Sequence, residues 1–314
     1  MPMPRRAVID VGTNSVKVLL ADVDEDDVRP VWETSLQTRL GEGFYETHLL
    51  QPGPIAATAA AVAGFAREAV ARGASHVRVV ATSAARDAAN GRELLDAIRN
   101  ASGLESEVVS GETEAAWAFA GVTTHPLQQD VRLLVLDVGG GSTEFILGER
   151  SRGGTAHVAH RSSHPMGSVR LRERFPPLDP PGRGELARVR AWLDDFLGRE
   201  VLPGLAGAMA SWGRPRRVLG VGGTTAILAM IEQGRDDFDR DAIEGASFTA
   251  ARLSGHVESL WSEDLAARRR RRGMPPERAD VVPFGAAIYE AVMRVTGLPE
   301  LGVSTRGLRF AAVA

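Results

Sequence analysis

The sequence predicts an α/β protein of two domains, each with a mixed β-sheet flanked by helices. One stretch is nearly written twice, because residues 7–16 read AVIDVGTNSV and residues 134–143 read LVLDVGGGST. Each copy predicts a strand, an Asp, a turn of small residues and a second strand. The chain has 314 residues, of which 44% are apolar, and this length suits two domains of ordinary size. We expect the two turns to face each other across a cleft between the domains.

The elements follow the same order in both halves, with runs of Val and Leu marking strands and longer Ala- and Leu-rich stretches marking helices. In the first half we expect strands near 6–10, 16–22, 28–38, 76–81 and 107–109, and helices near 54–72, around 94–98 and over 112–122. In the second half we expect strands at 132–137, 143–148, 155–163 and 217–221, with helices over 183–209 and after 224.

The loop at residues 123–130 is the predicted domain junction. We assign residues 1–124 and 299–314 to the first domain and residues 125–298 to the second, because the chain is expected to cross back near its end.

Composition excludes several classes of protein. The chain has no cysteine, which rules out disulfides, zinc sites built on thiolates and cysteine nucleophiles. No segment approaches the roughly 20 apolar residues that span a bilayer, and residues 1–6 lack the long apolar stretch of a signal peptide, so we expect none. The net charge of −3 argues against bulk binding of nucleic acid. We therefore expect a cytoplasmic protein without a nucleic-acid or membrane partner.

The two turns are suited to phosphate. Glycine allows backbone conformations that place successive N–H groups on one concave side, where they can bind phosphate oxygens. Two such turns facing each other would hold a phosphate chain from both sides. The donors that the two turns offer are Thr13, Asn14, Ser15, Gly139, Gly140, Gly141, Ser142 and Thr143.

The carboxylates beside the turns are suited to a metal ion. Magnesium prefers one or two carboxylates together with substrate oxygens and water. Asp137 and Glu144 are therefore the predicted Mg²⁺ ligands, and Asp10 is a further metal or water contact. Lys17 occupies the position equivalent to Glu144, and it either points toward phosphate or lies on a solvated strand face.

A third stretch of small residues, Gly222, Gly223 and Thr224, follows a predicted strand and begins a helix. The free N–H groups of a helix N-terminus bind anions, so this segment is a further predicted phosphate site. Close packing of the helix on the sheet is the alternative role of its glycines. No Gly-x-x-x-x-Gly-Lys-Ser/Thr sequence is present, which excludes a P-loop.

Five more motifs accompany the turns: residues 81–86 read ATSAAR, 110–115 read SGETEA, 220–225 read GVGGTT, 277–280 read ERAD and 303–309 read VSTRGLR. In this order they resemble the exopolyphosphatase and guanosine pentaphosphate phosphohydrolase (Ppx/GppA) family of the actin-like ATPase superfamily. One turn alone would indicate only the superfamily, whereas the ordered set spans Asp10 to Arg309. The chain departs from the family pattern at Thr305 and Phe310, where acidic residues are usual, and at Thr113, which interrupts an acidic pair.

The resemblance implies two actin-like (ribonuclease H-like) domains with the active site in the cleft between them. It also assigns a catalytic base. Glu112 and Glu114 lie in the first turn of a helix that Ser110 can cap, where acids merely favour the helix dipole. Family members place their catalytic Glu directly before the Ala of this helix, which corresponds to Glu114. By itself Arg86 suggests only a surface ion pair, whereas the resemblance makes it a phosphate clamp. The predicted catalytic residues are Glu114, Asp137, Glu144 and Arg86.

The implied reaction is hydrolysis of a phosphoric anhydride, in which a carboxylate orients and deprotonates the attacking water. Release of the terminal phosphate from inorganic polyphosphate is the expected activity, with Mg²⁺ as cofactor. Cleavage of guanosine pentaphosphate to the tetraphosphate uses the same site and is the first alternative. An ATP-binding assembly or chaperone protein is the second. A homodimer is compatible with all three.

The arginine run at residues 268–272 lies at the end of a predicted helix. We expect a solvated helix end in which Asp264 pairs with Arg268. The alternative interpretation is that these arginines form a surface patch that guides polyphosphate.

Overall fold

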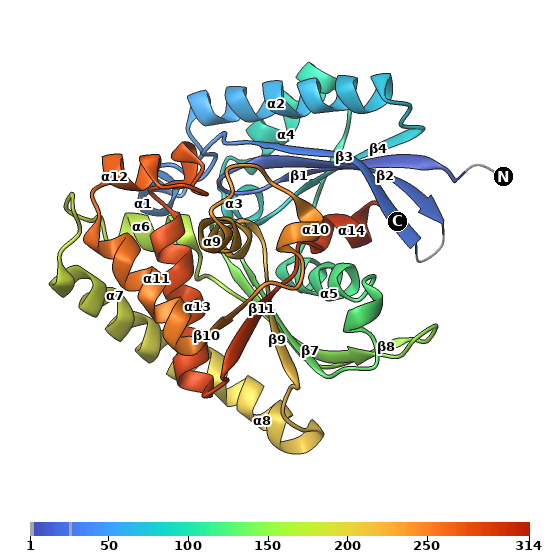
Figure 1. Cartoon of the computed structure of the whole chain (residues 1–314). Helices are drawn as coiled ribbons and strands as arrows, with labels where there is room; N and C mark the ends of the chain where they lie inside the picture. Colours follow the sequence, from blue (N-terminus) through green and yellow to red (C-terminus); the bar gives the residue numbers. More distant parts are fainter. Residues whose placement is uncertain (1–2, 25–26) are drawn as a thin grey trace. The chain divides into compact units, whose positions relative to one another are not determined.

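The computed structural model describes residues 3–24 and 27–314, and the chain divides into two compact units (Figure 1). The first unit runs to His125 and takes in Arg306–Ala314, while the second covers Pro126–Thr305. In the part of the chain that is described, no helix has the length and apolar character needed to cross a membrane.

The first unit is built on a five-stranded mixed sheet in the order β3-β2-β1-β4-β5. Its strands are β1 (Arg5–Val11), β2 (Val16–Asp24), β3 (Asp27–Leu36), β4 (His76–Ala81) and β5 (Ser106–Val108). Its helices are α1 (Phe44–Thr47), α2 (Pro52–Ala71), α3 (Ser83–Asp87), α4 (Gly91–Ser102), α5 (Gly111–Val122) and α14 (Leu308–Ala312). Residues of α2 and α4 pack on one face of the sheet, and residues of α14 pack on the other.

The second unit holds a six-stranded mixed sheet in the order β10-β11-β9-β6-β7-β8. Its strands are β6 (Leu133–Val138), β7 (Thr143–Arg150), β8 (Ala156–His164), β9 (Arg217–Val221), β10 (Ser247–Thr249) and β11 (Glu300–Val303). Its helices are α6 (Ser168–Arg174), α7 (Arg183–Phe196), α8 (Leu202–Trp212), α9 (Gly223–Gln233), α10 (Arg240–Ile243), α11 (Ala250–Ser262), α12 (Leu265–Arg270) and α13 (Val282–Thr296). Short 3-10 helices lie at Pro126–Gln128 and Pro276–Arg278, and a π-helical segment lies at Leu197–Val201.

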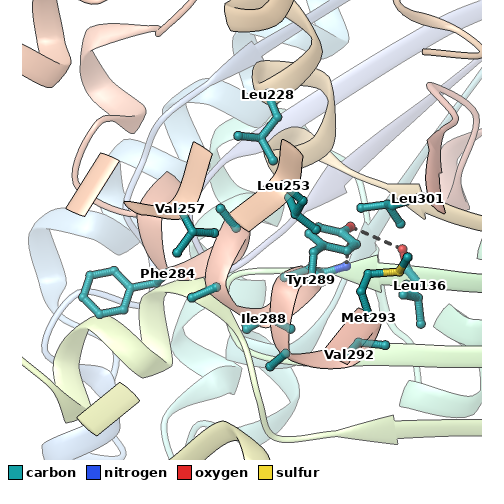
Figure 2. Close-up of a cluster of buried hydrophobic side chains, with 14 of the residues drawn as sticks. Leu136, Leu228, Leu253, Val257, Phe284, Ile288, Tyr289, Val292, Met293 and Leu301 are labelled. Atoms are coloured by element: carbon teal, nitrogen blue, oxygen red, sulfur yellow. Dashed lines mark hydrogen bonds between the residues drawn. The ribbon is translucent and has the colours of Figure 1, made fainter. Parts of the chain in front are cut away.

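The core of the second unit lies between its sheet and α13. Every residue of this helix from Val282 to Met293 is buried, so its neighbours cover α13 on all sides. All of these residues are uncharged except Glu290, which accepts from Arg190 Nε at 2.8 Å. Figure 2 shows its side chains interlocking with Leu136 of β6, Leu301 of β11 and residues of α9 and α11.

The two sheets share one strand order, because β8-β7-β6-β9-β11 repeats β3-β2-β1-β4-β5, and β10 is an added edge strand. The register repeats as well: Asp10 lies opposite Lys17 on the neighbouring strand, and Asp137 lies opposite Glu144. The predicted α/β fold of two mixed sheets flanked by helices is confirmed, as is the equivalence of Lys17 and Glu144.

The return of the chain to the first unit differs from the prediction. We expected residues 299–314 to belong to the first domain, but Gly302 and Val303 of β11 pair in parallel with β9. These backbone hydrogen bonds hold the chain in the second unit, which extends to Thr305, so that Arg306–Ala314 are the part that joins the first unit.

Candidate active site

The two repeated turns have the same backbone geometry. The N–H of Gly12 donates to the carbonyl of Ser15 at 3.0 Å, and the N–H of Gly139 donates to the carbonyl of Ser142 at 2.9 Å. A Cβ atom at either glycine would lie 3.2 Å from that serine carbonyl, which is tighter than ordinary van der Waals contact. A side chain at either position would therefore press on the equivalent serine carbonyl.

The carbonyls of the second turn are held by the first residues of α6. The N–H groups of Ser168 and Arg170 donate to the carbonyls of Gly139 and Gly140 at 3.0 and 3.1 Å, and Arg170 Nε donates to the carbonyl of Gly141 at 2.9 Å. In a planar trans peptide the C=O and the following N–H point in opposite directions. The N–H groups of residues 140–142 consequently point away from α6, and this makes the second turn a concave set of donors.

The first turn is held in the same way by the segment after its third strand. The N–H of Gly41 donates to the carbonyl of Thr13 at 2.7 Å, and the N–H of Arg39 donates to the carbonyl of Asn14 at 3.0 Å. The N–H groups of Asn14 and Ser15 therefore point away from this segment.

Gly41 and Gly167 occupy equivalent places after β3 and β8, and both contact the turns closely. A Cβ atom on Gly41 would lie 2.3 Å from Thr13 Cγ2, and one on Gly167 would lie 2.4 Å from the carbonyl oxygen of Gly140. Our sequence analysis missed these supports. The available signal was a repeated pair of a buried apolar residue and a glycine, Leu40–Gly41 and Met166–Gly167.

The hydroxyl groups predicted to bind phosphate are largely buried. Thr13, Ser15, Ser142 and Thr224 are each at most 5% exposed. Thr143 is fully buried, and its hydroxyl donates to the carbonyl of Met166, so this side chain supports the turn from inside.

The two hairpins differ in charge. In the first, Lys17 Nζ lies 3.6 Å from Asp10 Oδ2, and the pair is close to neutral. In the second, the equivalent cross-strand pair is formed by two carboxylates, Asp137 and Glu144. Glu144 is only 3% exposed and accepts a hydrogen bond from Ser163 Oγ at 2.7 Å. Asp137 is half-buried, and two acids opposite each other with limited access to water favour a nearby cation.

The predicted metal ligands belong to different units, with Asp10 in the first and Asp137 and Glu144 in the second. Among residues 3–24 and 27–314, no three His, Cys, Asp or Glu side chains form a group that could hold a metal ion by themselves. A pair of carboxylates nevertheless fits Mg²⁺, because this ion commonly takes its other ligands from substrate phosphates and water.

The N-terminus of α9 lies beside the second turn. Gly222 has a φ of 95°, a conformation that favours glycine, and a Cβ atom there would lie 3.2 Å from Asp137 Oδ1. A Cβ atom on Gly223 would lie 2.1 Å from Nη2 of Arg278. The guanidinium of Arg278 therefore contacts the first turn of α9, and the sequence analysis gave this side chain no role.

Tyr289 of α13 fixes the ends of the strands that carry these groups. Its fully buried hydroxyl donates to the carbonyl of Val221 at 2.7 Å, and it accepts from the N–H of Val138 at 3.4 Å. The hydroxyl thus bridges the ends of β6 and β9, whose last paired residues are Asp137 and Val221. It also lies 3.3 Å from the carbonyl oxygen of Leu136 in β6, and both residues are drawn in Figure 2. Burial and the nearby carboxylate of Asp137 raise the pKa of Tyr289, so this group is a neutral hydrogen-bond donor.

Replacing Tyr289 with Phe should lower the free energy of unfolding by about 1–3 kcal/mol, because the buried carbonyl of Val221 loses its donor. Urea unfolding of the variant measures this loss. Ser211→Ala is the matched control, since it removes an exposed hydroxyl of α8. Equal stability of the Phe variant and the wild type would show that the hydroxyl does not hold the strand ends.

Glu114 and Arg86 meet in the first unit. Ser110 caps α5 by accepting from the N–H of Thr113, as predicted, and this places Glu114 in the first helical turn. Glu114 is 7% exposed, whereas Glu112 is exposed to solvent. Arg86 Nη1 donates to Glu114 Oε1 and, at 3.0 Å, to the carbonyl of Val109. The structure thus pairs the predicted base with the predicted phosphate clamp.

The expected solvation of the arginine run was wrong for its first member. Arg268 is 3% exposed and donates to the carbonyl of Ala279 at 3.2 Å, and burial lowers the pKa of its guanidinium. Asp264 Oδ1 accepts from the N–H of Ala267 and caps α12. Arg271 pairs with Glu263 at 3.0 Å, whereas Arg269 and Arg270 are exposed, as the sequence predicted.

Comparison with known proteins identifies the relatives of this chain. Residues 19–311 match the sequence model of the Ppx/GppA phosphatase family. Exopolyphosphatase 2 of Mycobacterium tuberculosis is 31% identical, and the match covers 97% of this chain and 96% of that protein. Exopolyphosphatase 1 of Mycobacterium bovis is 28% identical over 97% of this chain and 86% of its own length.

Solved structures give the same result. An exopolyphosphatase from Cytophaga hutchinsonii superposes with a TM-score of 0.85 and 26% identity, covering 98% of this chain and 96% of that one. A Ppx/GppA protein from Aquifex aeolicus superposes with a TM-score of 0.78 and 27% identity, covering 99% of this chain and 96% of the other.

Proposed function

Because the chain belongs to the Ppx/GppA phosphatase family, we propose that it is an exopolyphosphatase that releases orthophosphate from the end of inorganic polyphosphate. The observation that carries the proposal is the second turn, where the hydrogen bonds from α6 leave three successive N–H groups pointing to one side. Beside these donors lie the paired carboxylates of Asp137 and Glu144. Donors for phosphate next to ligands for a cation suit a phosphoanhydride.

In the proposed reaction the two turns hold the phosphate chain. Thr13, Asn14 and Ser15 offer donors from the first turn, and residues 139–142 offer them from the second. The N-terminus of α9, at Gly222, Gly223 and Thr224, adds a third set. Donors fixed in this way hold the phosphate chain in position for attack by water.

Glu114 is the proposed general base. Its carboxylate takes a proton from water as the water oxygen attacks the terminal phosphorus, and the bond from that phosphorus to the bridging oxygen breaks. Arg86 offsets the cost of burying this carboxylate. We propose that the guanidinium of Arg86, whose side chain is 25% exposed, also contacts the terminal phosphate.

We propose Mg²⁺ as the cofactor, with Asp137 and Glu144 as its ligands and Asp10 as a further contact. When bound, Mg²⁺ would neutralise charge on the phosphate oxygens. The two protein carboxylates set where that charge is placed, and Ser163 orients Glu144 by its hydrogen bond.

Guanosine pentaphosphate is the alternative substrate, since it presents the same terminal anhydride to the same donors. The relatives named as exopolyphosphatases favour polyphosphate. Orthophosphate release from polyphosphate, guanosine pentaphosphate and ATP, measured side by side at equal concentrations of terminal phosphate, tests the proposal. The highest kcat/KM should be found with polyphosphate, and a higher value with either nucleotide would overturn it.

The two hairpins should respond differently to loss of their carboxylates. Asp137→Asn should raise the Mg²⁺ concentration needed for half-maximal activity more than Asp10→Asn does, because Asp137 faces Glu144 whereas Asp10 faces Lys17. Activity is measured against Mg²⁺ concentration for both variants. Identical curves would mean that the hairpins share the metal evenly, and the asymmetric assignment would be wrong.

A further inference from the structure

The orientation of the second turn depends on where α6 lies, because the first residues of this helix hold three of the turn's carbonyls. The helix is only seven residues long, and an ion pair connects it to a buried group distant in sequence. Arg172 Nη1 lies 3.3 Å from Oδ2 of Asp280, which is 8% exposed. This pair connects α6 to the segment that precedes α13.

That segment is itself fixed. The buried guanidinium of Arg268 donates to the carbonyl of Ala279, the residue immediately before Asp280. The N–H of Val281 donates to the carbonyl of Arg278, which closes a turn around Asp280. The carboxylate of Asp280 is therefore held in place by its own segment, and its partner Arg172 belongs to the short helix α6.

We propose that Asp280 is a positioning residue for the phosphate-binding turn at residues 139–142, acting through Arg172 and α6. Its carboxylate holds Arg172, Arg172 holds α6, and the N–H groups of Ser168 and Arg170 then fix the carbonyls of Gly139 and Gly140. This inference depends on the proposed function in one respect, namely which phosphate compound binds to the turn.

Loss of the charge should loosen the turn without removing any group that contacts substrate. Asp280→Asn and Arg172→Gln should each weaken binding of inorganic tripolyphosphate by about tenfold, because donors that bind ground state and transition state alike change KM more than kcat. The value of kcat should stay within about threefold of wild type for the same reason. Arg172→Lys retains the charge and should restore most of the binding.

The experiment combines calorimetric binding of tripolyphosphate, kcat and KM for polyphosphate, and hydrogen exchange of the full-length chain. Exchange at residues 168–170 should rise in Asp280→Asn and Arg172→Gln. Arg174→Gln is the matched control, because Arg174 lies on the same helix, is exposed and contacts the ring of Trp192. The double variant should bind no worse than the weaker single variant, since both changes break one pair.

Unchanged exchange at residues 168–170 in Asp280→Asn would overturn the proposal, and so would raised exchange with tripolyphosphate binding at the wild-type level. Equal losses of tripolyphosphate binding in Arg172→Lys and Arg172→Gln would also overturn it. That result would mean that the positive charge at residue 172 does not matter and that Arg172 contributes only to general stability. Failure of the wild type to hydrolyse polyphosphate would reject the proposed function instead. Binding and exchange would still decide the role of Asp280.

Discussion

Glu114→Gln should lower kcat by about 10² or more, the usual effect of losing a general base. The amide keeps the shape of the side chain but accepts no proton from water. Binding of polyphosphate should persist, because the donors of both turns are unchanged. Glu112→Gln is the matched control, since Glu112 lies in the same helical turn and is exposed. Steady-state rates of orthophosphate release measure both variants.

Near-normal turnover in a folded Glu114→Gln protein would reject the assignment of the base. A large loss in Glu112→Gln with normal Glu114→Gln would move the role to the exposed acid. The pairing of Glu114 with Arg86 can be tested through Arg86→Lys. The lysine keeps a positive charge, but its single ammonium would have to contact both Glu114 and the carbonyl of Val109.

Gly167→Ala should lower kcat/KM by about 10²-fold, since small displacements of positioning groups can cost this much. The added Cβ would lie 2.4 to 2.6 Å from three backbone atoms of Gly140 and Gly141, and backbone atoms cannot swing aside as a side chain can. The turn must therefore shift. Gly184→Ala in α7 is the control, because nothing lies within 4 Å of its added Cβ.

Thermal unfolding of both variants separates a shifted turn from a general loss of stability. Activity of Gly167→Ala within a few-fold of wild type would show that the turn tolerates displacement. In that case the hydrogen bonds from α6 would not set the geometry of phosphate binding.

Much of the fold could be predicted because its central motif occurs twice in the sequence. The repeated strand, Asp, turn and strand gave the register that pairs Asp10 with Lys17 and Asp137 with Glu144. Strands β10 (SFT) and β11 (ELGV) were missed, because neither short strand contains the run of Val or Leu by which we recognised the other strands. Missing β11 also placed the return of the chain too early.

The sequence predicted those residues of the candidate site that lie in local motifs or that the family resemblance assigns. Contacts between residues far apart in sequence leave no local signal. The pair of Arg86 with Glu114, the support of the second turn by Gly167 and the bridge made by Tyr289 are all of this kind. The expectation that Arg268 is solvated was wrong for the same reason. The carbonyl that accepts its buried hydrogen bond belongs to Ala279, eleven positions away on a separate turn.

The most direct test of the central claim is the product pattern from long-chain polyphosphate. The purified full-length protein is incubated with Mg²⁺ and polyphosphate, and orthophosphate and residual chain length are followed together. We expect orthophosphate from the first time point while the remaining chains shorten gradually, with Glu114→Gln releasing about 10²-fold less. Fragments of intermediate length without orthophosphate, or intact polyphosphate beside rapid hydrolysis of guanosine pentaphosphate or ATP, would contradict an exopolyphosphatase.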